Sequence, residues 1–378
     1  DPSWASLDEA TQKENKYIGN DFIENIVKPM NAARGNELPV SAFLGYEDGG
    51  FTEGTTQYEK RGIGITVPMW IEENCIQCNQ CVFVCPHAVI RPFLLDENEV
   101  ENAPQTVKDK LLDAKGKEVK GLKYKIQVSP LDCTGCTLCA EACPSKEKSL
   151  VMVPLNDELD RGEQENADYL FKEVTYKDDL MNKESVKGSG FAEPLFEFHA
   201  ACPGCGETPY LTLITRLYGE QMIVANATGC SSIYGGSAPS MPYKKGQNGR
   251  GVAWANSLFE DNAEFGLGMK VATETIRHRI ENIMLDTKDK VPNALSALYN
   301  DWLEFKDDSI KSAEVRDKII PILEQNKDVE GVKELLNLKN YLAKKSQWII
   351  GGDGWAYDIG YGGVDHVLAM GDDINMLV

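Results

Sequence analysis

Two short cysteine runs are the residues most clearly arranged for chemistry. They contain Cys75, Cys78, Cys81 and Cys85, followed by Pro86, and Cys133, Cys136, Cys139 and Cys143, followed by Pro144. Each run has the spacing C-x2-C-x2-C-x3-C-P, with which bacterial ferredoxins bind iron–sulfur clusters. Three thiolates on one tight loop can hold three corners of a cubane, and the fourth cysteine points toward the other cluster. Zinc also uses C-x2-C pairs, but it has no use for the third cysteine of each run.

The spacing therefore predicts two [4Fe–4S] clusters with crossed ligands. One cluster should take Cys75, Cys78, Cys81 and Cys143, and the other should take Cys133, Cys136, Cys139 and Cys85. A hydrophilic insertion, residues 96–125, separates the runs, and we expect it to change the surface rather than the ligation. We interpret His87 as a packing residue. Two neighbouring clusters transfer single electrons, so they require an electron source and an electron sink.

Three further cysteines lie outside these runs. Cys202 and Cys205 belong to Cys-Pro-Gly-Cys-Gly before a helical stretch, and Cys230 belongs to Thr-Gly-Cys after an apolar one. The total of 11 cysteines is odd and nothing marks the chain as secreted, so a disulfide framework is not expected. Three thiolates could bind zinc, could form a redox pair with one uninvolved cysteine, or could be three of the four ligands of a further cluster. The ferredoxin-like module favours the cluster, whose fourth ligand would come from elsewhere.

A glycine-rich turn offers a second kind of chemistry. Ile349 and Ile350 precede Gly351-Gly352-Asp353-Gly354-Trp355. Glycines let the backbone approach a diphosphate closely, and an Asp at the carboxyl end of a strand can bind the Mg²⁺ that bridges two phosphates. A tight strand-to-helix turn explains the same residues equally well. Asn375 lies in the next apolar run, and we interpret it as structural.

Short apolar strands and longer helices should position these residues. We expect strands at 222–226, 348–350 and 374–378, and this pattern predicts a parallel α/β sheet. The helical candidates are 206–218, 268–285, 294–305, 310–325 and 329–344. The predicted fold class combines α/β and α+β. The predicted domains are a tail and connector (1–57), a two-cluster ferredoxin-like domain (58–155), a polar linker (156–190) and an incomplete α/β domain (191–378).

Composition narrows the classes of partner. The chain has 378 residues, with 39 Lys and Arg against 59 Asp and Glu, which gives a net charge of −20. Such an acidic chain is a poor partner for nucleic acid or an anionic membrane, because both are polyanions. It has no apolar run of about 18 residues that would form a transmembrane helix. The sequence begins without Met or a signal peptide, and we expect it to be part of a longer protein.

The motifs together resemble one enzyme family. Tyr58-Glu59-Lys60-Arg61, the doubled cysteine run, Cys-Pro-Gly-Cys-Gly, Thr-Gly-Cys and Gly-Asp-Gly-Trp occur in the order found in pyruvate:ferredoxin (flavodoxin) oxidoreductases. The resemblance covers residues 18–378. It implies decarboxylation of pyruvate with coenzyme A to acetyl-CoA and CO₂, using thiamine diphosphate and Mg²⁺. Electrons would pass through three [4Fe–4S] clusters to ferredoxin or flavodoxin, in a cytoplasmic homodimer.

The resemblance also implies roles for single residues. Cys202, Cys205 and Cys230 would bind the cluster proximal to thiamine diphosphate, and Glu207 and Cys230 would lie beside that cofactor. The diphosphate and Mg²⁺ segment would be Gly352, Asp353, Gly354 and Trp355, with Asp353 as a Mg²⁺ ligand. The fourth cluster ligand, the remaining Mg²⁺ ligands and the pyruvate-binding residues would lie outside residues 1–378.

Two alternatives remain open. A 2-oxoglutarate or indolepyruvate oxidoreductase would use the same clusters and thiamine domain. A non-catalytic iron–sulfur subunit would use the clusters alone, and Gly-Asp-Gly-Trp counts against it.

Overall fold

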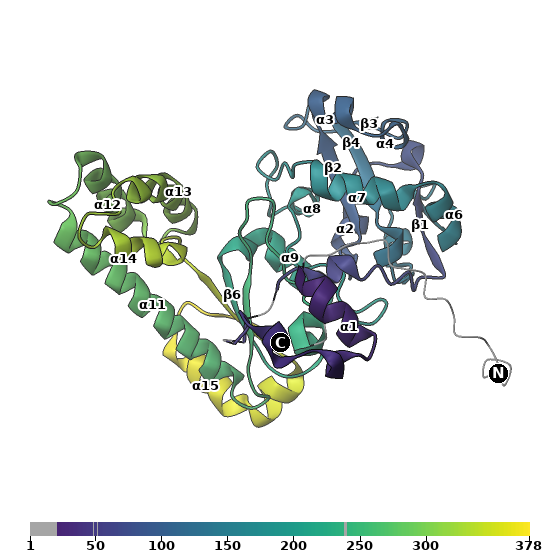
Figure 1. Ribbon diagram of the computed structural model, residues 1–378. Helices are drawn as coiled ribbons and strands as arrows, with labels where there is room; N and C mark the ends of the chain where they lie inside the picture. Colours follow the sequence, from purple (N-terminus) through teal and green to yellow (C-terminus); the bar gives the residue numbers. More distant parts are fainter. Residues whose placement is uncertain (1–20, 48, 51, 238–239) are drawn as a thin grey trace. The chain divides into compact units, whose positions relative to one another are not determined.

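The computed structural model describes residues 21–47, 49–50, 52–237 and 240–378, which form two compact units (Figure 1). The first unit contains the described residues up to Val174, together with Glu197–Gly204 and residues 240–242. The second contains Thr175–Phe196, residues 205–237 and Tyr243–Val378. Residues 1–20 of the tail and connector expected at 1–57 lie outside the described residues.

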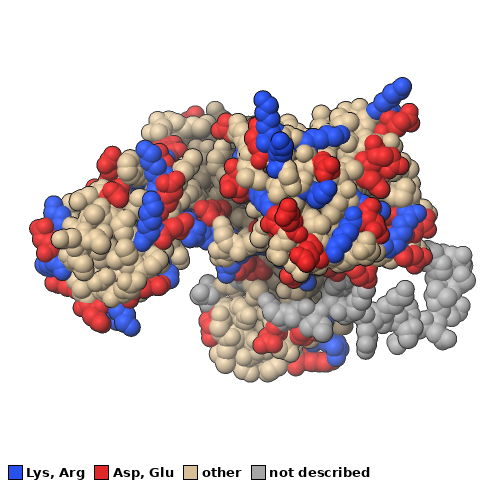
Figure 2. Space-filling model, turned by 90° about the horizontal axis from the view of Figure 1, so that it is seen from above, with Lys and Arg blue, Asp and Glu red and all other residues tan. Residues whose placement is uncertain are grey.

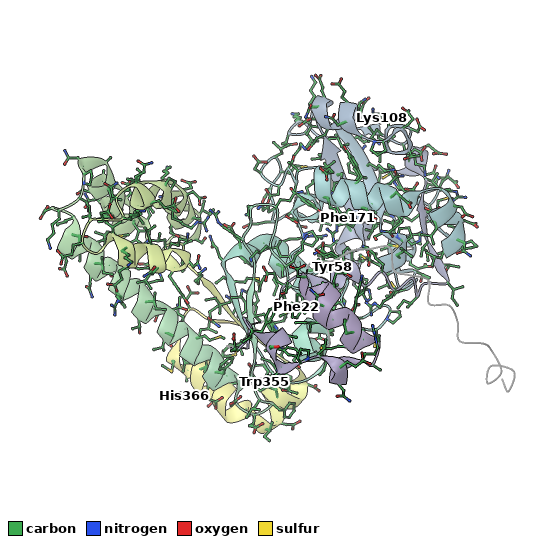
Figure 3. The ribbon with its side chains drawn as sticks, in the orientation of Figure 1. Phe22, Tyr58, Lys108, Phe171, Trp355 and His366 are labelled. Atoms are coloured by element: carbon green, nitrogen blue, oxygen red, sulfur yellow. The ribbon has the colours of Figure 1, made fainter. Side chains whose placement is uncertain are left out.

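The described part of 21–58 packs around a small apolar cluster. Its buried members are Phe22 and three residues of the π turn η2 (Ile23–Val27), and α1 (Lys28–Asn31) follows without a buried residue. The ring of Phe22 lies 4.8 Å from that of Tyr46, and Tyr58 packs against the same cluster (Figure 3). The short 3-10 turns η3 (Gly35–Glu37), η4 (Val40–Phe43) and η5 (Thr55–Tyr58) complete this segment.

The two cysteine runs lie between strands that pair in a crossed order. The first run lies between β1 (Thr66–Trp70) and β2 (Ile90–Leu95), and the second between β4 (Lys123–Val128) and β5 (Leu150–Pro154). β1 pairs antiparallel with β5, and β2 pairs antiparallel with β4. This pairing brings the start of each run beside the end of the other, as the crossed ligand pattern requires. Cys81 and Cys139 sit in the short helices α2 (Gln80–Phe83) and α5 (Leu138–Glu141).

The insertion between the runs has regular structure. It contains α3 (Glu97–Asn102), α4 (Gln105–Lys108) and β3 (Leu112–Asp113), and β3 extends the sheet by pairing with β4. Asp96 and Glu99 form a reciprocal capping box at the start of α3, which satisfies two otherwise unpaired backbone N–H groups.

The polar stretch 156–190, expected to be a linker, is largely helical. It contains most of α6 (Leu155–Asp160), all of α7 (Glu163–Glu173) and the start of α8 (Val186–Phe191), and the first unit extends to Val174. The side-chain Oε1 of Gln164 accepts a hydrogen bond of 2.9 Å from the Leu131 N–H, and Gln127 donates to Glu163. Because α7 buries polar side chains in specific hydrogen bonds, hydropathy alone gave no sign of its packing.

The second unit is built on a parallel sheet, which confirms that part of the prediction. The strand order is β7-β6-β8-β9 and every neighbouring pair is parallel. The strands are β6 (Met222–Asn226), β7 (Ala253–Asn256), β8 (Ser346–Ile350) and β9 (Asn375–Leu377). The sequence analysis did not predict β7, an edge strand whose short apolar stretch contains no fully buried residue. The Asn375 side chain donates to the Gln347 carbonyl, which agrees with a structural role.

Long helices connect and flank this sheet. α11 (Asn262–Thr287) carries a bundle of α12 (Asn293–Phe305), α13 (Ser309–Gln325) and α14 (Val332–Asn337) at one end, and α15 (Tyr361–Met370) lies along the other (Figure 1). The remaining pieces are α9 (Thr208–Tyr218), α10 (Cys230–Ser232) and the turns η9 (Ile233–Ser237), η10 (Lys339–Tyr341) and η11 (Gly354–Ile359). Each predicted helix overlaps one of these elements, although α11 begins earlier than expected.

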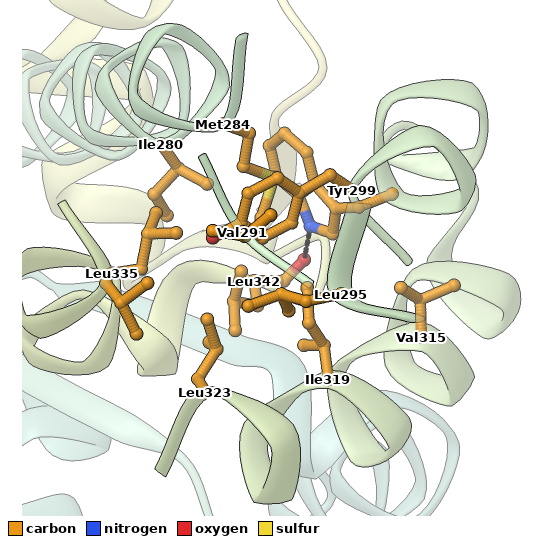
Figure 4. Packing of buried hydrophobic residues seen from close by; sticks show 12 residues of the cluster. Ile280, Met284, Val291, Leu295, Tyr299, Val315, Ile319, Leu323, Leu335 and Leu342 are labelled. Atoms are coloured by element: carbon orange, nitrogen blue, oxygen red, sulfur yellow. Dashed lines mark hydrogen bonds between the residues drawn. The ribbon is translucent and has the colours of Figure 1, made fainter. Parts of the chain in front are cut away.

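The bundle has an apolar core of its own (Figure 4). Trp302 is fully buried there, and its indole N–H donates a hydrogen bond of 2.7 Å to the Leu342 carbonyl. Leu295, Ile319 and Leu323 are also fully buried in this cluster. The apolar faces of these helices therefore meet in this one cluster.

The charged side chains at the surface and the hydropathy of the helices are the features that the composition led us to examine. On the face shown in Figure 2, basic and acidic side chains are interspersed. Among the described residues, no helix combines the length and the apolar character needed to cross a membrane.

Trp302→Ala should destabilise the bundle by about 3–5 kcal/mol, because it removes a large buried side chain and leaves a cavity. Hydrogen–deuterium exchange of the amides in α12 and α13 would measure this loss as faster exchange. The control is Ile310→Ala, since Ile310 is 71% exposed, and it should change stability by no more than about 0.5 kcal/mol. Equal exchange in the two variants would contradict the assignment of Trp302 to the core.

Candidate cluster cavities and cofactor-binding edge

Four cysteines line one cavity of the first unit, which we call the first cavity. They are Cys75, Cys78, Cys81 and Cys143. Burial raises the pKa of Cys81, and the neighbouring Cys75, Cys78 and Cys143 raise it further. The Trp70 and Tyr124 side chains also line this cavity. The residues grouped here are the first ligand set expected from the sequence.

The other four cysteines line a second cavity. They are Cys85, Cys133, Cys136 and Cys139. Burial raises the pKa of Cys133 to about 12, with smaller contributions from Cys85 and Cys136. His87, Val89 and Ile90 complete much of the wall. Both cavities thus take one cysteine from the opposite run, because the crossed strand pairing brings the ends of the runs together.

The chemistry of these donor sets fits a four-iron cluster. In the described part of the chain, no three His, Cys, Asp or Glu side chains converge on a point suited to a single metal ion. A cubane is held instead by four thiolates spaced around a cavity. Burial disfavours the thiolate at Cys81 and Cys139, whereas bound iron stabilises a coordinating thiolate. The cavities therefore suit a positively charged iron core.

Left-handed backbone shapes both cysteine loops. Gln77 and Asn79 have φ near 61°, and Gly135 and Thr137 take corresponding positions with φ of 70° and 67°. Gln77 is not a glycine, and its side chain donates to the Asp113 carbonyl at 2.9 Å. The Tyr124 hydroxyl donates to Asn79 Oδ1 at 2.8 Å. The insertion thus supports the first loop, a role that the sequence reading did not anticipate.

The motif Glu59-Lys60-Arg61 binds the segment that leads to Cys202. Lys60 pairs with the buried Asp132 carboxylate at 2.6 Å, next to Cys133. Arg61 donates to the carbonyls of Phe198 and His199 at 3.1 and 2.9 Å. One motif therefore contacts both the second cysteine run and residues 197–204.

A buried ion pair fixes the same segment. Arg91 on β2 pairs with Glu197, and their side chains are 1% and 4% exposed. The Arg91 guanidinium lies 4.2 Å from the ring centre of Phe171 and 5.2 Å from that of Phe198. Aromatic faces attract a cation, so the charge is neutralised by Glu197 and covered by two rings. This pair could not be predicted from the sequence, because its members lie on distant segments.

In the second unit, the strand order creates a natural binding edge. The chain passes from β6 to β7 on one side of the sheet, and β8 and β9 extend the other side. The connections thus diverge between β6 and β8, and ligands of open α/β sheets bind at the carboxyl ends beside such a point. The loop 227–230 follows β6 and the loop 351–354 follows β8. We call these two loops the cofactor-binding edge.

A hydrogen-bond network holds the starts of these loops. The Asn226 amide donates to the Ile350 carbonyl at 3.2 Å and to Ser231 Oγ at 2.9 Å. Asn262 donates to the same Ile350 carbonyl at 3.0 Å. Asn226 is fully buried and joins the ends of two strands. The sequence reading missed this residue, although a polar residue at the end of an apolar strand is a usable signal.

The glycines of the second loop have different roles. A side chain at Gly351 would meet Trp355 at 2.6 Å and Ala227 at 2.8 Å, so only glycine fits there. Gly352 has open space where a side chain would stand, and Asp353 is exposed. The described residues include no hydrogen-bonding or ion-pairing partner of the Asp353 carboxylate. This carboxylate is thus available for a cation.

Trp355 occupies a different environment from Asp353. It is fully buried with Ala227, Ile349 and Val364, whereas His366 of the neighbouring α15 is exposed (Figure 3). Trp355 therefore anchors the loop in the core, a packing position that the resemblance did not indicate.

Glu207 faces two tyrosines. It precedes α9, and burial together with the Glu207 charge raises the pKa of the Tyr234 hydroxyl. Burial and the Glu207 charge also raise the pKa of Tyr243. Tyr234 lies four residues after Cys230, and the Cys205 charge contributes to its shift. Cys205, Glu207 and Tyr234 thus share one neighbourhood, and the sequence reading identified only the first two.

The remaining cysteines belong to separate units. Cys202 lies in the first unit, and Cys205 and Cys230 lie in the second. Cys202 and Cys230 are exposed and Cys205 is half-buried. Their common role therefore rests on spacing and resemblance.

Known families match two parts of the chain. A 4Fe-4S dicluster domain matches residues 74–146, which include both cysteine runs. A domain of unknown function named EKR matches residues 9–64, which include Glu59-Lys60-Arg61.

Individual relatives match the whole chain. It is 51% identical to the pyruvate:ferredoxin oxidoreductase of Moorella thermoacetica, covering 100% of this chain and 32% of that protein. It is 48% identical to the pyruvate-flavodoxin oxidoreductase of Klebsiella pneumoniae, covering 99% and 32%. The mitochondrial pyruvate dehydrogenase [NADP(+)] of Euglena gracilis is 43% identical, with 100% and 20% covered. The chain spans about a third or less of these relatives.

Glu197→Gln should destabilise the first unit by about 3–5 kcal/mol, because it leaves the buried Arg91 charge without its counter-ion. Denaturation followed by the visible absorbance of the clusters would measure the loss. Arg91→Met with Glu197→Leu should recover much of it, since no buried charge remains. The control, Asp113→Asn, breaks the exposed pair with Lys123 and should cost less than about 1 kcal/mol. Similar losses in Glu197→Gln and the control would be inconsistent with a critical buried pair.

Proposed function

Because the chain corresponds over its whole length to a segment of pyruvate:ferredoxin and pyruvate-flavodoxin oxidoreductases, we propose that it forms part of an enzyme that decarboxylates pyruvate with coenzyme A, yielding acetyl-CoA and CO₂. The observation that carries this proposal is the crossed arrangement of eight cysteines around two cavities, in a chain similar throughout to these enzymes. The first unit transfers electrons, and the second contributes to cofactor binding.

The eight cysteines of the two cavities bind two [4Fe–4S] clusters. Cys75, Cys78, Cys81 and Cys143 bind one, and Cys85, Cys133, Cys136 and Cys139 bind the other. Burial of Cys85, Cys133, Cys139 and Cys143 and the left-handed turns in both cysteine loops support this assignment. Cys202, Cys205 and Cys230 bind a third, proximal cluster with a fourth ligand from outside residues 1–378.

The cofactor-binding edge holds thiamine diphosphate and Mg²⁺. Its place at the carboxyl ends of β6 and β8, the open space at Gly352 and the exposed Asp353 support this proposal. Gly352 and Gly354 let the backbone approach the diphosphate, Asp353 binds Mg²⁺, and Trp355 fixes the loop. Bound thiamine diphosphate supplies a nucleophilic carbon and accepts the electron pair released when CO₂ leaves. Glu207 and Cys230 lie beside the cofactor, and Tyr234 lies close enough to Glu207 for the Glu207 charge to raise its pKa.

The electron acceptor is ferredoxin or flavodoxin. The names of the Moorella and Klebsiella relatives support these carriers, and the name of the Euglena relative points to NADP in another branch. A homodimer and a cytoplasmic location follow from the resemblance alone.

Three clusters predict about twelve iron and twelve sulfide atoms per chain in the anaerobically purified protein. Metal and sulfide analysis would test this number. Cys230→Ser should reduce it to about eight of each, because the proximal cluster loses a ligand. Zinc together with about eight irons in the unaltered protein would contradict the proximal cluster.

Asp353→Asn should weaken Mg²⁺-dependent binding of thiamine diphosphate by about tenfold or more, because it removes a negatively charged oxygen ligand. Calorimetric titration of the complete enzyme with the cofactor would measure the affinity. Asp358→Asn is the matched control, since Asp358 is exposed in the same η11 turn, and it should bind normally. Unchanged affinity in Asp353→Asn would remove the proposed Mg²⁺ role.

A further inference from the structure

His87 connects the second cavity to the segment that contains Cys202. It follows Cys85 by two residues, lines the second cavity, and is 2% exposed. Its Nε2 lies 2.9 Å from the carbonyl oxygen of Ala201, the residue before Cys202. Because a carbonyl only accepts, Nε2 carries the proton, and Nδ1 accepts from the Thr134 hydroxyl at 3.5 Å. One hydrogen bond thus joins the neighbours of two proposed cluster ligands.

His199 makes the reciprocal connection. Its Nε2 donates to the Pro86 carbonyl at 2.6 Å, and its Nδ1 accepts from the Ala201 N–H at 3.3 Å. The two imidazole rings are stacked, with centroids 4.5 Å apart. The Phe198 N–H also donates to the His87 carbonyl at 3.0 Å. All these residues belong to the first unit.

Each of the four ring nitrogens of the two histidines has a hydrogen-bonding partner. Each ring has one donor and one acceptor nitrogen, as expected of a neutral imidazole. A packing role alone requires no such reciprocal bonding, because an apolar ring would fill the space without the cost of burying polar atoms. The arrangement is therefore specific for holding residues 85–87 and 199–202 in contact.

We propose that the His87–Ala201 hydrogen bond is the main path for electron transfer between the cluster bound at Cys202 and the cluster bound at Cys85. The path runs from Cys202 through Ala201 across one hydrogen bond to His87, and then through Pro86 to Cys85. This inference rests on the proposed proximal cluster. It assigns His87 a positioning and coupling role that ligand spacing does not indicate.

The step transfers one electron and no atoms. One electron would pass from the reduced proximal cluster to the cluster of the second cavity, and His87 would keep its proton. The bond from His199 to Pro86 offers a parallel connection. Removing the His87 donor should therefore slow the transfer rather than abolish it.

His87→Phe tests the proposal in the complete enzyme, because it keeps an aromatic ring for stacking on His199 and removes the donor. Freeze-quench electron paramagnetic resonance after mixing with pyruvate and coenzyme A would follow the reduction of each cluster. We expect an unchanged iron content, normal reduction of the proximal cluster, and a transfer onward that is slower by about tenfold to hundredfold. His87→Gln, which retains an N–H donor, should restore most of the rate. His278→Phe is the control, since the His278 side chain is 71% exposed on α11.

Four results would overturn the proposal. Transfer in His87→Phe at the unaltered rate with all clusters present would show that the path lies elsewhere. Loss of the second-cavity cluster in both His87→Phe and His87→Leu would show that His87 supports that cluster instead. Equal slowing in His87→Gln would exclude the hydrogen bond. A content of only two clusters per chain in the unaltered enzyme would exclude the proximal cluster itself. This result can be told apart from the other three, in which all three clusters are present before the substitution.

Discussion

The ion pair between Arg91 and Glu197 is the constraint on which much of the first unit depends. A guanidinium and a carboxylate are both almost fully enclosed, and each would be very costly to bury without the other. Arg91 lies on the strand that follows the first cysteine run, and Glu197 begins the segment that ends at Gly204. The ion pair therefore helps to fix where the segment that contains Cys202 lies within this unit.

Two further cations hold the same segment and the neighbouring cysteine run in place. Lys60 and Asp132 form a second enclosed pair beside Cys133, and Arg61 binds carbonyls of the 197–204 segment. The EKR motif thus has a physical explanation, because its two cations contact different parts of the cluster environment. The second unit is held by neutral side chains instead. There, neutral amide side chains of Asn226 and Asn262 hold strand ends that surround a binding edge.

The features predicted from the sequence are those that depend on residues close together in the chain. The cysteine spacing predicted which residues would share each cavity, and the apolar runs predicted β6, β8 and β9. The linker prediction failed to anticipate α7, because its buried Glu163 and Gln164 find partners far along the chain. For the same reason the sequence did not reveal Arg91–Glu197, the tyrosines around Glu207, or the His87–His199 stack. These depend on pairs of residues brought together only by the folded chain.

The helical bundle inserted between β7 and β8 has a consequence for folding. β6 pairs with both strands, yet the chain must complete α11 to α14 before β8 is synthesised. Joining the two sides of the sheet through an unstructured segment of that length would carry a larger loop-closure entropy than a short connection. Because the bundle has its own core, it can form first from local contacts and hold the ends of this connection near each other. The folded bundle thus lowers the entropic barrier to completing the sheet. In a newly synthesised chain whose bundle has not yet formed, the edges of β6 would remain unpaired for longer.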